Sequence, residues 1–290
     1  MALIPFDDRD GFIWFNGKMT PWREAKIHVI SHGLHYASSI FEGERAYNGK
    51  IFKSREHSER FVRSARLIDM DMPYSVDELE TAKYETMKAN NLADCYVRPV
   101  AWRGAEQMGI AARQTKTHVA IAVWAWPAYF STELLENGIT MQTSQWRKPA
   151  PETAPTASKT ACLYAIGTMS KHAAENAGCH DALMLDYRGL VAEATGANLF
   201  MVKNNKIFTP IPDCFLNGIT RQTVIEIAHE LNIPLQETRI TPEDLMQADE
   251  IFLSGTATEI TPVGKIDTHT FNVGPVFKQI RTRYLELVNS

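Results

Sequence analysis

Residues 155–167 read PTASKTACLYAIG, and Lys159 is the only charged residue in this stretch. The small and apolar residues after it predict a helix, so Lys159 would lie just before a helix N-terminus, where the helix dipole disfavours a cation. Most lysines are solvated surface residues. Poor solvation lowers the pKa of an amine, which is how a lysine becomes a nucleophile or an aldehyde-binding group. Lys159 is therefore a candidate reactive amine.

The composition indicates a packed globular protein and argues against several classes of partner. The 290 residues, 44% hydrophobic and 22% charged, suffice for one large or two medium domains. A formal net charge of −4, without a run of lysine or arginine, argues against a nucleic-acid-binding protein. The longest apolar run, HVAIAVWAWPAYF at 118–130, is too short to span a bilayer and predicts a buried strand.

The cysteines and the first residues predict a cytoplasmic protein. The chain begins MALIPFDDRD, with acidic residues where a signal peptide would be basic and then apolar. The four cysteines form no CxxC pair, which indicates free thiols in a reducing compartment. They are Cys95, Cys162, Cys179 and Cys214.

Residues 1–127 have the pattern of a small α+β unit. Asn-Gly pairs at 16–17 and 48–49 predict tight hairpin turns between strand-like runs. The β-branched and aromatic segments at 94–102 and 117–126 predict further strands.

Two helices are predicted between these strands. SREHSERFVRSARLIDM (54–70) has apolar residues at helical spacing, with Phe61 and Ala65 on one face. Ser75 and Glu78 fit a capping box, so a second helix should start there.

A proline-rich segment separates this unit from the rest of the chain. Its prolines predict an interdomain connection at 128–136 and a loop at 147–157. The predicted division is therefore a small domain at 1–127, the connection, and a large domain at 137–290.

The large domain has α/β content and no G-x-G-x-x-G sequence, so a Rossmann nucleotide site is unsupported. A helix after Lys159 should carry Leu163, Ile166, Ser170 and Ala173 on one face and end at Gly178. Strands are predicted at 181–186, 197–210 with a turn at Asn204-Asn205, and 249–255. A helix at 219–233 should bury Val224, Ile227 and Leu231.

The commonest protein-bound aldehyde is pyridoxal 5′-phosphate, which needs a lysine, an acidic partner for its ring nitrogen and a phosphate cradle. Two turns could cradle a phosphate. Asn217-Gly218 precede a helix whose first amides would face an anion. Ser254-Gly255-Thr256 end a strand with amides and hydroxyls that could converge. Each signal alone is weak, because glycine before a helix is ordinary.

Other polar residues admit both ordinary and functional interpretations. Glu193, predicted in a loop, could be a solvated carboxylate. Tyr96 and Arg98 share one strand face, although the proline after Arg98 permits an edge strand with the guanidinium in water. For His32 and His35, packing or hydrogen bonding is favoured over metal binding, since no third ligand stands out.

Seven motifs occur in an order that carries a family resemblance. They are SHGLHYASSIFEGERAYNGKIF, SREHSERF, YVRP, the ASK lysine with a tyrosine five residues on, VAEATGANLF, NGITR and SGTATEITPV. Together they resemble the class IV (fold-type IV) pyridoxal-phosphate aminotransferases, and among these the branched-chain amino acid aminotransferases. The resemblance runs from about residue 12 to 267.

The resemblance implies a fold and a set of site residues. The implied fold is α+β, with a small two-layer α/β N-terminal domain and a larger C-terminal pseudo-barrel domain. Lys159 would be the Schiff-base lysine and Glu193 the partner of the ring nitrogen. The other implied cofactor contacts are Tyr164 to the phenolate oxygen, and Arg60, Gly218, Ile219, Thr220 and Thr256 to the phosphate. The implied substrate-binding residues are Tyr36, Phe41, Tyr96, Arg98, Trp126, Tyr129 and Ala257; no metal is implied.

The implied activity is reversible ping-pong transfer of an amino group between L-leucine, L-isoleucine or L-valine and 2-oxoglutarate, as in branched-chain amino acid biosynthesis. Arg98 would bind the distal carboxylate of glutamate. The YVR signature favours this subgroup over D-amino acid aminotransferases and aminodeoxychorismate lyases. Glu44 stands where many relatives carry an apolar residue, which leaves open an altered preference or a salt bridge with Arg45.

Rival interpretations remain at this point. A D-amino acid or (R)-amine aminotransferase would keep Lys159 and Glu193 and invert the substrate. A hydrolase is unsupported because the chain has no G-x-S-x-G sequence. A non-catalytic binding protein would not need an amine at residue 159. The expected partners are small amino acids and 2-oxo acids, without nucleic acid or membrane, in a homo-oligomer (dimer or hexamer).

Overall fold

The computed structural model describes residues 4–126 and 131–290. The chain forms two compact units. The first comprises Met1–Pro127 and Ser158–Cys162, and the second Ala128–Ala157 and Leu163–Ser290. The segment that carries Lys159 therefore belongs with the first unit, whereas the sequence predicts it within the domain at 137–290.

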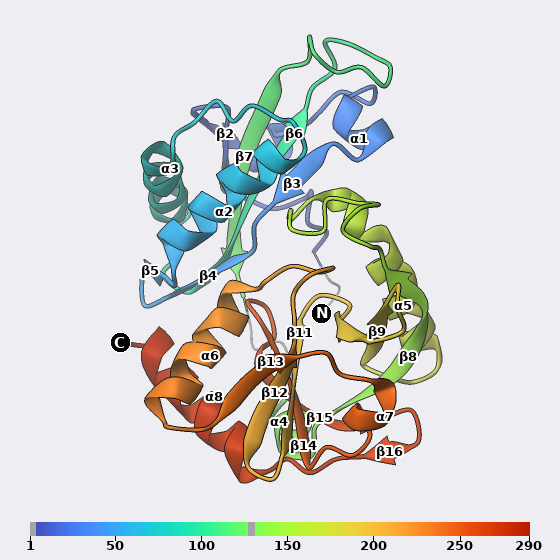
Figure 1. The fold of residues 1–290 in the computed structure, drawn as a ribbon. Helices are drawn as coiled ribbons and strands as arrows, with labels where there is room; N and C mark the ends of the chain where they lie inside the picture. The colour runs from blue at the N-terminus through green and yellow to red at the C-terminus, as the bar shows by residue number, and fades with distance from the viewer. Residues whose placement is uncertain (1–3, 127–130) are drawn as a thin grey trace. The chain divides into compact units, whose positions relative to one another are not determined.

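The first unit is built on one antiparallel sheet, which has seven strands within the described residues. They are β1 (Phe12–Phe15), β2 (Lys18–Pro21), β3 (Ser39–Phe41), β4 (Glu44–Tyr47), β5 (Lys50–Ile51), β6 (Cys95–Arg103) and β7 (Thr117–Ala125). The order is β2-β1-β7-β6-β4-β5, and β3 pairs with β6 next to β4. Helices α2 (Ser54–Leu67) and α3 (Val76–Ala89) cover one face of this sheet (Figure 1).

Burial of one face explains both helices. Phe61 and Ala65 of α2 are 1% and 0% exposed, as the helical spacing predicts, and Leu79 of α3 joins the same core. The capping box is confirmed, because the Glu78 N–H donates to Ser75 Oγ and the Ser75 N–H donates to Glu78 Oε2.

Both Asn-Gly turns are present where predicted. Asn16 and Gly17, with φ of 49° and 88°, join β1 to β2. Asn48 and Gly49, with φ of 50° and 83°, join β4 to β5. A two-residue hairpin needs this left-handed backbone, and asparagine and glycine adopt it at least cost.

Strand β6 is internal, so the edge-strand alternative for Pro99 and Arg98 is wrong. Strand β7 pairs along all of β6, whereas on the other side β4 pairs as far as Val97 and β3 starts at Val100. Pro99 faces the gap between these two strands, where its carbonyl accepts from the Glu42 N–H. The N–H that proline lacks therefore interrupts no ladder hydrogen bond.

The second unit has nine strands within the described residues, and six of them close a barrel. Strand β10 pairs with β9 on one side and β11 on the other, which completes the ring β10-β9-β8-β15-β14-β11. The ring strands are β8 (Ile139–Lys148), β9 (Asp181–Asp186), β10 (Val191–Ala194), β11 (Asn198–Lys203), β14 (Glu250–Gly255) and β15 (Glu259–Ile266). The others are β12 (Lys206–Pro210), β13 (Leu235–Thr238) and β16 (His269–Thr270).

The barrel strands are buried on both faces. Leu199 of β11 and Leu253 of β14 belong to one core cluster of the barrel. On the opposite face Phe200 and Phe252 stack at 5.0 Å, and Phe277 of helix α8 (Pro275–Val288) lies 6.1 Å from Phe252. Strands β11 and β14 each have a continuous apolar run in sequence because both of their faces are buried.

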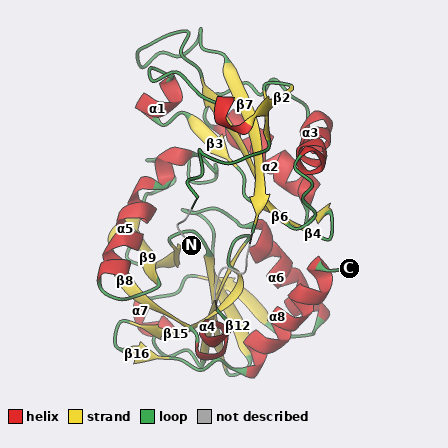
Figure 2. Ribbon diagram, turned by 180° about the vertical axis from the view of Figure 1, so that it is seen from behind, coloured by secondary structure: helices red, strands yellow, loops and turns green. Residues whose placement is uncertain are grey.

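Helices pack around the barrel, as Figures 1 and 2 show. Helix α5 (Ala165–Asn176) lies against β8 and β9, whereas α6 (Ile219–Glu230) and α8 lie against β14. In α6, Val224 and Ile227 are buried as predicted, but Leu231 lies just beyond the helix and is 36% exposed. No described helix is long and apolar enough to cross a membrane.

The prediction for helix α5 is only partly right. Gly178 follows its end with φ of 78°, as predicted. Its buried residues are Gly167, Ser170 and Ala174, whereas Ala173 is exposed. The helix starts after a 3-10 turn that contains Leu163, so Lys159 does not lie directly before its N-terminus as expected.

The segments around the proline-rich region are more ordered than predicted. Helix α4 (Thr132–Asn137) overlaps the predicted connection at 128–136, and β8 extends into the predicted loop at 147–157. A further short helix, α7 (Pro242–Leu245), precedes β14. The two-layer first unit and the barrel of the second confirm the predicted α+β architecture.

Candidate active site

The Lys159 segment is fixed to the first unit through its backbone. The Lys159 N–H donates to Ser64 Oγ of α2 (3.0 Å), and the Lys159 carbonyl accepts from the Phe41 N–H (3.1 Å). The Thr160 hydroxyl donates to the Ser39 carbonyl of β3 (2.9 Å). The lysine is therefore held from both sides, by a helix and by a strand.

Lys159 and Arg98 share one aromatic ring. Lys159 Nζ and Arg98 Cζ each lie 4.9 Å from the centre of the Phe41 ring. Arg98 Nη2 donates to the Tyr96 hydroxyl (3.1 Å), which confirms that these two side chains share a face. Arg98 Nε is buried and has no hydrogen-bond partner among the described residues. Because a buried donor without a partner is costly, a carboxylate ligand would stabilise it.

Two further predicted substrate residues, Trp126 and Tyr36, lie at different places in the first unit. The Tyr96 ring lies 4.8 Å from that of Trp126, so Trp126 joins the group around Arg98. Tyr36 ends helix α1 (His32–Tyr36), where its ring lies 4.5 Å from that of His32 and is partly exposed. Tyr129 lies outside the described residues.

The two histidines of the SHGLHY motif make hydrogen bonds, as the sequence favours. His32 Nδ1 lies 2.6 Å from Ser38 Oγ, and its Nε2 lies 3.0 Å from the Gly109 carbonyl. His35 Nε2 lies 2.9 Å from the Val29 carbonyl. These contacts fix the segment around α1.

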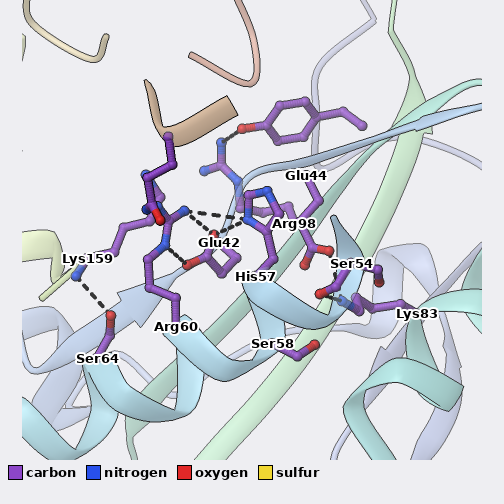
Figure 3. Close-up of polar contacts among 12 residues, drawn as sticks. Glu42, Glu44, Ser54, His57, Ser58, Arg60, Ser64, Lys83, Arg98 and Lys159 are labelled. Atoms are coloured by element: carbon purple, nitrogen blue, oxygen red, sulfur yellow. Dashed lines mark hydrogen bonds and ion pairs between the residues drawn. The ribbon is translucent and has the colours of Figure 1, made fainter. Parts of the chain in front are cut away.

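Arg60 is held by a buried carboxylate. Arg60 Nε donates to Glu42 Oε1 (2.8 Å) and Nη2 donates to Oε2 (2.7 Å), and His57 Nδ1 lies 2.7 Å from the same Oε2 (Figure 3). The three side chains are at most 5% exposed. Burial acts to raise the pKa of Glu42, but Arg60 and His57 hold it well below its usual range. Burial lowers the pKa of His57 to about 4, so near neutral pH His57 is neutral and its Nδ1–H donates to Glu42. Arg60 therefore has a fixed orientation and a balanced charge.

Glu44 forms its ion pair with Lys83 of α3 rather than with Arg45. Lys83 Nζ lies 2.8 Å from Glu44 Oε2 and 2.6 Å from Glu80 Oε1, and neither the Glu44 nor the Lys83 side chain is exposed (Figure 3). Burial raises the pKa of Glu44, and Lys83 offsets part of this effect. Arg45 lies over the Tyr47 ring instead. Glu44 is therefore a buried member of the packing between sheet and helices.

In the second unit, Glu193 lies in strand β10 and is 7% exposed, whereas the sequence predicts a loop. Lys148 Nζ lies 2.7 Å from Glu193 Oε1, and Asn198 Nδ2 donates to Oε2 (3.0 Å). Burial acts to lower the pKa of Lys148, but the Glu193 carboxylate acts the other way and leaves it raised. Glu193 is therefore a buried carboxylate with a cation on one oxygen and an amide on the other.

The sequence interpretation missed three of these residues: Glu42, Lys148 and Asn198. Glu42 is charged at the end of a strand, and His57 and Arg60 are spaced three apart on one helix face, which is a detectable pattern. Lys148 ends strand β8, in a segment interpreted as a polar loop. No local signal distinguishes Asn198 from other strand-initiating residues.

Helix α6 presents its first amides without a capping side chain. Its N-cap is Gly218, with no side-chain cap hydrogen bond, and the helix begins at Ile219. Ile219 and Thr220 are 7% and 5% exposed. Amides at the start of a helix, together with its dipole, favour an anion. The predicted phosphate contacts of this turn therefore have suitable chemistry.

The SGTAT turn has the second set of suitable groups. Ser254 Oγ and Thr258 Oγ1 are buried and have no hydrogen-bond partner among the described residues. They lie on either side of Thr256, a predicted phosphate contact. Tyr164 and Ala257 line one cavity of about 320 Å³ in the second unit. Tyr164 and Ala257, two more of the predicted site residues, therefore line the same cavity.

One cluster of possible metal ligands lies apart from the predicted site residues, and an arginine side chain binds its carboxylates. Asp186, Asp213 and Cys214 have ligand atoms within 4.8 Å of one another. Arg188 donates to both carboxylates, at 2.6–2.9 Å. Burial raises the pKa of Cys214 to about 12, so its thiol stays protonated. The cluster is therefore an ion-pair network that fixes the chain.

Comparisons with known proteins agree with the motifs and the fold. The sequence profile of the family "Amino-transferase class IV" matches residues 39–266. The "Probable branched-chain-amino-acid aminotransferase" of Rickettsia felis is 40% identical over 99% of each chain. The "Branched-chain-amino-acid aminotransferase" of Escherichia coli K12 is 40% identical over 95% of this chain and 92% of its own.

Solved structures give the same result. The branched-chain aminotransferase of the archaeon Thermoproteus uzoniensis, solved with norvaline, superposes with a TM-score of 0.93 at 38% identity, covering 97% of this chain and 95% of its own. The Escherichia coli branched-chain amino acid aminotransferase superposes with a TM-score of 0.93 at 39% identity and the same coverage. With a closed barrel, a buried Glu193, a lysine held at Phe41 and this similarity over almost all of its length, the chain belongs to the class IV aminotransferases.

Proposed function

We propose that this protein is a branched-chain amino acid aminotransferase, which transfers the amino group between L-leucine, L-isoleucine or L-valine and 2-oxoglutarate with pyridoxal 5′-phosphate. The observation that carries the proposal is the pairing of Lys159 and Arg98 at the Phe41 ring. One side chain is an amine that can bind an aldehyde, and the other is a guanidinium that can bind a carboxylate.

The residues of the chain fit pyridoxal 5′-phosphate. The uncapped start of α6 and the buried hydroxyls beside Thr256 suit the phosphate. The carboxylate of Glu193 suits a protonated ring nitrogen. We assign the phosphate to Arg60, Gly218, Ile219, Thr220 and Thr256, and the phenolate oxygen to Tyr164.

When bound, the cofactor supplies an electron-withdrawing ring that accepts the electron pair left at the substrate Cα. The Glu193 carboxylate keeps the ring nitrogen protonated. Lys159 would hold the cofactor at its aldehyde carbon through Nζ, and the same amine would accept the proton at the substrate Cα. Its backbone contacts to Ser64 and Phe41 keep the lysine in place during both roles.

We assign substrate selection to the side chains of the first unit. The aromatic rings of Phe41, Tyr96 and Trp126 provide an apolar surface for a branched aliphatic side chain. Burial of such a side chain is worth about 1.5–3 kcal/mol. Arg98 binds the distal carboxylate when glutamate or 2-oxoglutarate enters, through the nitrogen that has no partner in the described part of the chain. Tyr36, Tyr129 and Ala257 remain predicted substrate-binding residues, and Ala257 belongs to the second unit.

We also propose that the protein is a homo-oligomer. Val29, Leu34 and Ile110 of the first unit are 74%, 60% and 83% exposed. An apolar cavity of about 400 Å³ lies beside Leu34 and is lined also by Phe15 and Trp102. Exposed apolar surface of this kind marks an interface. Sedimentation of wild type and Leu34→Asp tests this proposal, because a smaller species is expected for the variant.

Amino transfer from L-leucine to 2-oxoglutarate, measured as glutamate formation with added pyridoxal phosphate, tests the activity. Lys159→Ala should abolish it, whereas Lys203→Ala, a lysine at the end of β11 with no assigned role, should not. Activity with D-alanine and none with L-leucine would establish a D-amino acid aminotransferase instead. Full activity of Lys159→Ala would contradict the assignment of the reactive amine.

A further inference from the structure

Asn198 lies where three predicted cofactor-binding segments meet in the second unit. It is the first residue of β11 and is 5% exposed. In the sheet it is opposite Glu193 of β10 on one side and opposite Ser254 of β14 on the other. The residue is thus next to the carboxylate assigned to the ring nitrogen and next to the turn assigned to the phosphate.

The side chain of Asn198 uses its hydrogen-bonding groups on these same segments. Its Nδ2 donates to Glu193 Oε2 and to the Leu216 carbonyl, both at 3.0 Å. Its Oδ1 accepts from the Gly218 N–H (3.1 Å), at the N-cap of helix α6. An asparagine amide has two N–H donors, and both have partners here.

The contact with helix α6 also fixes the residue at its start. A Cβ atom on Gly218 would lie 2.2 Å from Asn198 Oδ1, so a larger residue at 218 would have to displace the Asn198 amide. Glycine leaves the space that this amide occupies. The first turn of α6 is thereby tied directly to the side chain that holds Glu193.

We propose that Asn198 is a positioning residue, which sets the separation between the Glu193 carboxylate and the first turn of α6, whose amides and Thr220 side chain are assigned to the phosphate. The inference rests on the proposed function, in which these two groups hold opposite ends of pyridoxal 5′-phosphate. A rigid ligand held at two ends gains affinity from both only when the two sites are at the matching separation.

A purely structural role would be different. In that case Asn198 would only satisfy the buried backbone groups of Leu216 and Gly218, and its loss would lower stability without changing how the two sites act together. The two roles differ in one measurable quantity, the coupling between substitutions at Glu193 and at Thr220.

The experiment is a double-mutant cycle on pyridoxal phosphate affinity, measured by equilibrium absorbance titration of the cofactor-free protein. Glu193→Gln and Thr220→Ala are combined, first in the wild-type background and then with Asn198→Leu. In the wild-type background, each substitution should raise Kd about tenfold less when the other is already present than when it is made alone. With Asn198→Leu, Kd should rise about tenfold to a hundredfold, and the two effects should multiply.

Thr209→Val is the matched control. Thr209 is a fully buried residue of the same sheet, and its hydroxyl donates to the Leu199 carbonyl (2.8 Å). Its loss removes a buried hydrogen bond in the same unit but should leave the coupling unchanged. A structural role for Asn198 would make the two variants behave alike.

Asn198→Asp carries the test if Asn198→Leu does not fold. It keeps the acceptor for the Gly218 N–H but places a second carboxylate beside Glu193, which raises the pKa of one of the pair. The donor to Glu193 is lost as well, so the coupling between Glu193→Gln and Thr220→Ala should also be lost in this background.

Retained coupling in Asn198→Leu or in Asn198→Asp would overturn the inference while the proposed function stands. Absence of pyridoxal phosphate binding by the wild type, or normal binding by both Glu193→Gln and Thr220→Ala, would instead overturn the proposed function.

Discussion

Replacement of Glu42 by glutamine should destabilise the first unit strongly. The Glu42 carboxylate has hydrogen bonds with Arg60 Nε, Arg60 Nη2 and His57 Nδ1, and its side chain is 0% exposed. Glutamine removes the charge and offers a single acceptor oxygen, so the Arg60 guanidinium stays buried without a counter-charge. Loss of one partner of such a buried pair costs about 3–5 kcal/mol.

The matched control is Glu59→Gln on helix α2, the helix that carries Arg60. Glu59 lies 3.3 Å from Arg55, and the two side chains are 52% and 61% exposed. The chemical change is identical, but an exposed pair is worth at most about 1 kcal/mol. The difference between the two variants therefore isolates the effect of burial.

Urea unfolding followed by tryptophan fluorescence measures this difference. Five of the six tryptophans belong to the first unit, so the signal reports mainly on the unit that contains Glu42. With a denaturant slope of about 2 kcal/mol per molar, the midpoint for Glu42→Gln should fall by about 2 M. Equal midpoints for the two glutamine variants would refute the reasoning.

His57, Gly218 and Arg98 each give a further expectation. Because the pKa of His57 is about 4 in the folded chain against 6.5 in the unfolded chain, the unfolded state binds more protons between these values. The stability of the first unit should therefore fall by roughly 3 kcal/mol between pH 6.5 and pH 4, in urea melts of wild type but not of a His57→Gln variant. Gly218→Ala should weaken pyridoxal phosphate binding more than tenfold, because its Cβ would meet Asn198 Oδ1 at 2.2 Å. Equal affinities of Gly218→Ala and wild type in the same titration would contradict the assigned clash. Arg98→Met should reduce kcat/KM for 2-oxoglutarate by about tenfold to a hundredfold but affect L-leucine less, and equal losses for both substrates would exclude a role with the distal carboxylate.

Local signals in the sequence predict the elements of the fold well. The two Asn-Gly turns, the capping box at Ser75 and the helical spacing around Phe61 depend on neighbouring residues, and all three are confirmed. The boundaries that fail depend on distant partners. Helix α5 buries Gly167 and Ala174 because β8 and β9 pack against that face, which no periodicity of a weakly amphipathic helix reveals.

Pairing with neighbouring strands also determines the positions of two residues that the sequence leaves open. The sequence permits Pro99 on an edge, yet the gap between β3 and β4 accepts it inside the sheet. Glu193 resembles a loop carboxylate because its strand has only four residues, and its burial depends on pairing with both β9 and β11. Closure of the barrel is a long-range property, which a linear pattern does not contain.

The candidate site shows the same limit. The motifs identify the residues assigned to the cofactor and substrate, because those residues lie in recognisable segments. The residues that hold them in place, Glu42, Lys148 and Asn198, act through contacts with elements far along the chain. Such residues are found only when the fold brings their partners together.

A single spectroscopic titration decides the role of Lys159. The purified protein is incubated with pyridoxal 5′-phosphate, and its absorption spectrum is recorded before and after addition of L-leucine. The proposed function predicts a yellow band that L-leucine bleaches, and no such band with Lys159→Ala. A band that only D-alanine bleaches would contradict the branched-chain assignment, and the absence of any band would contradict the role of Lys159 itself.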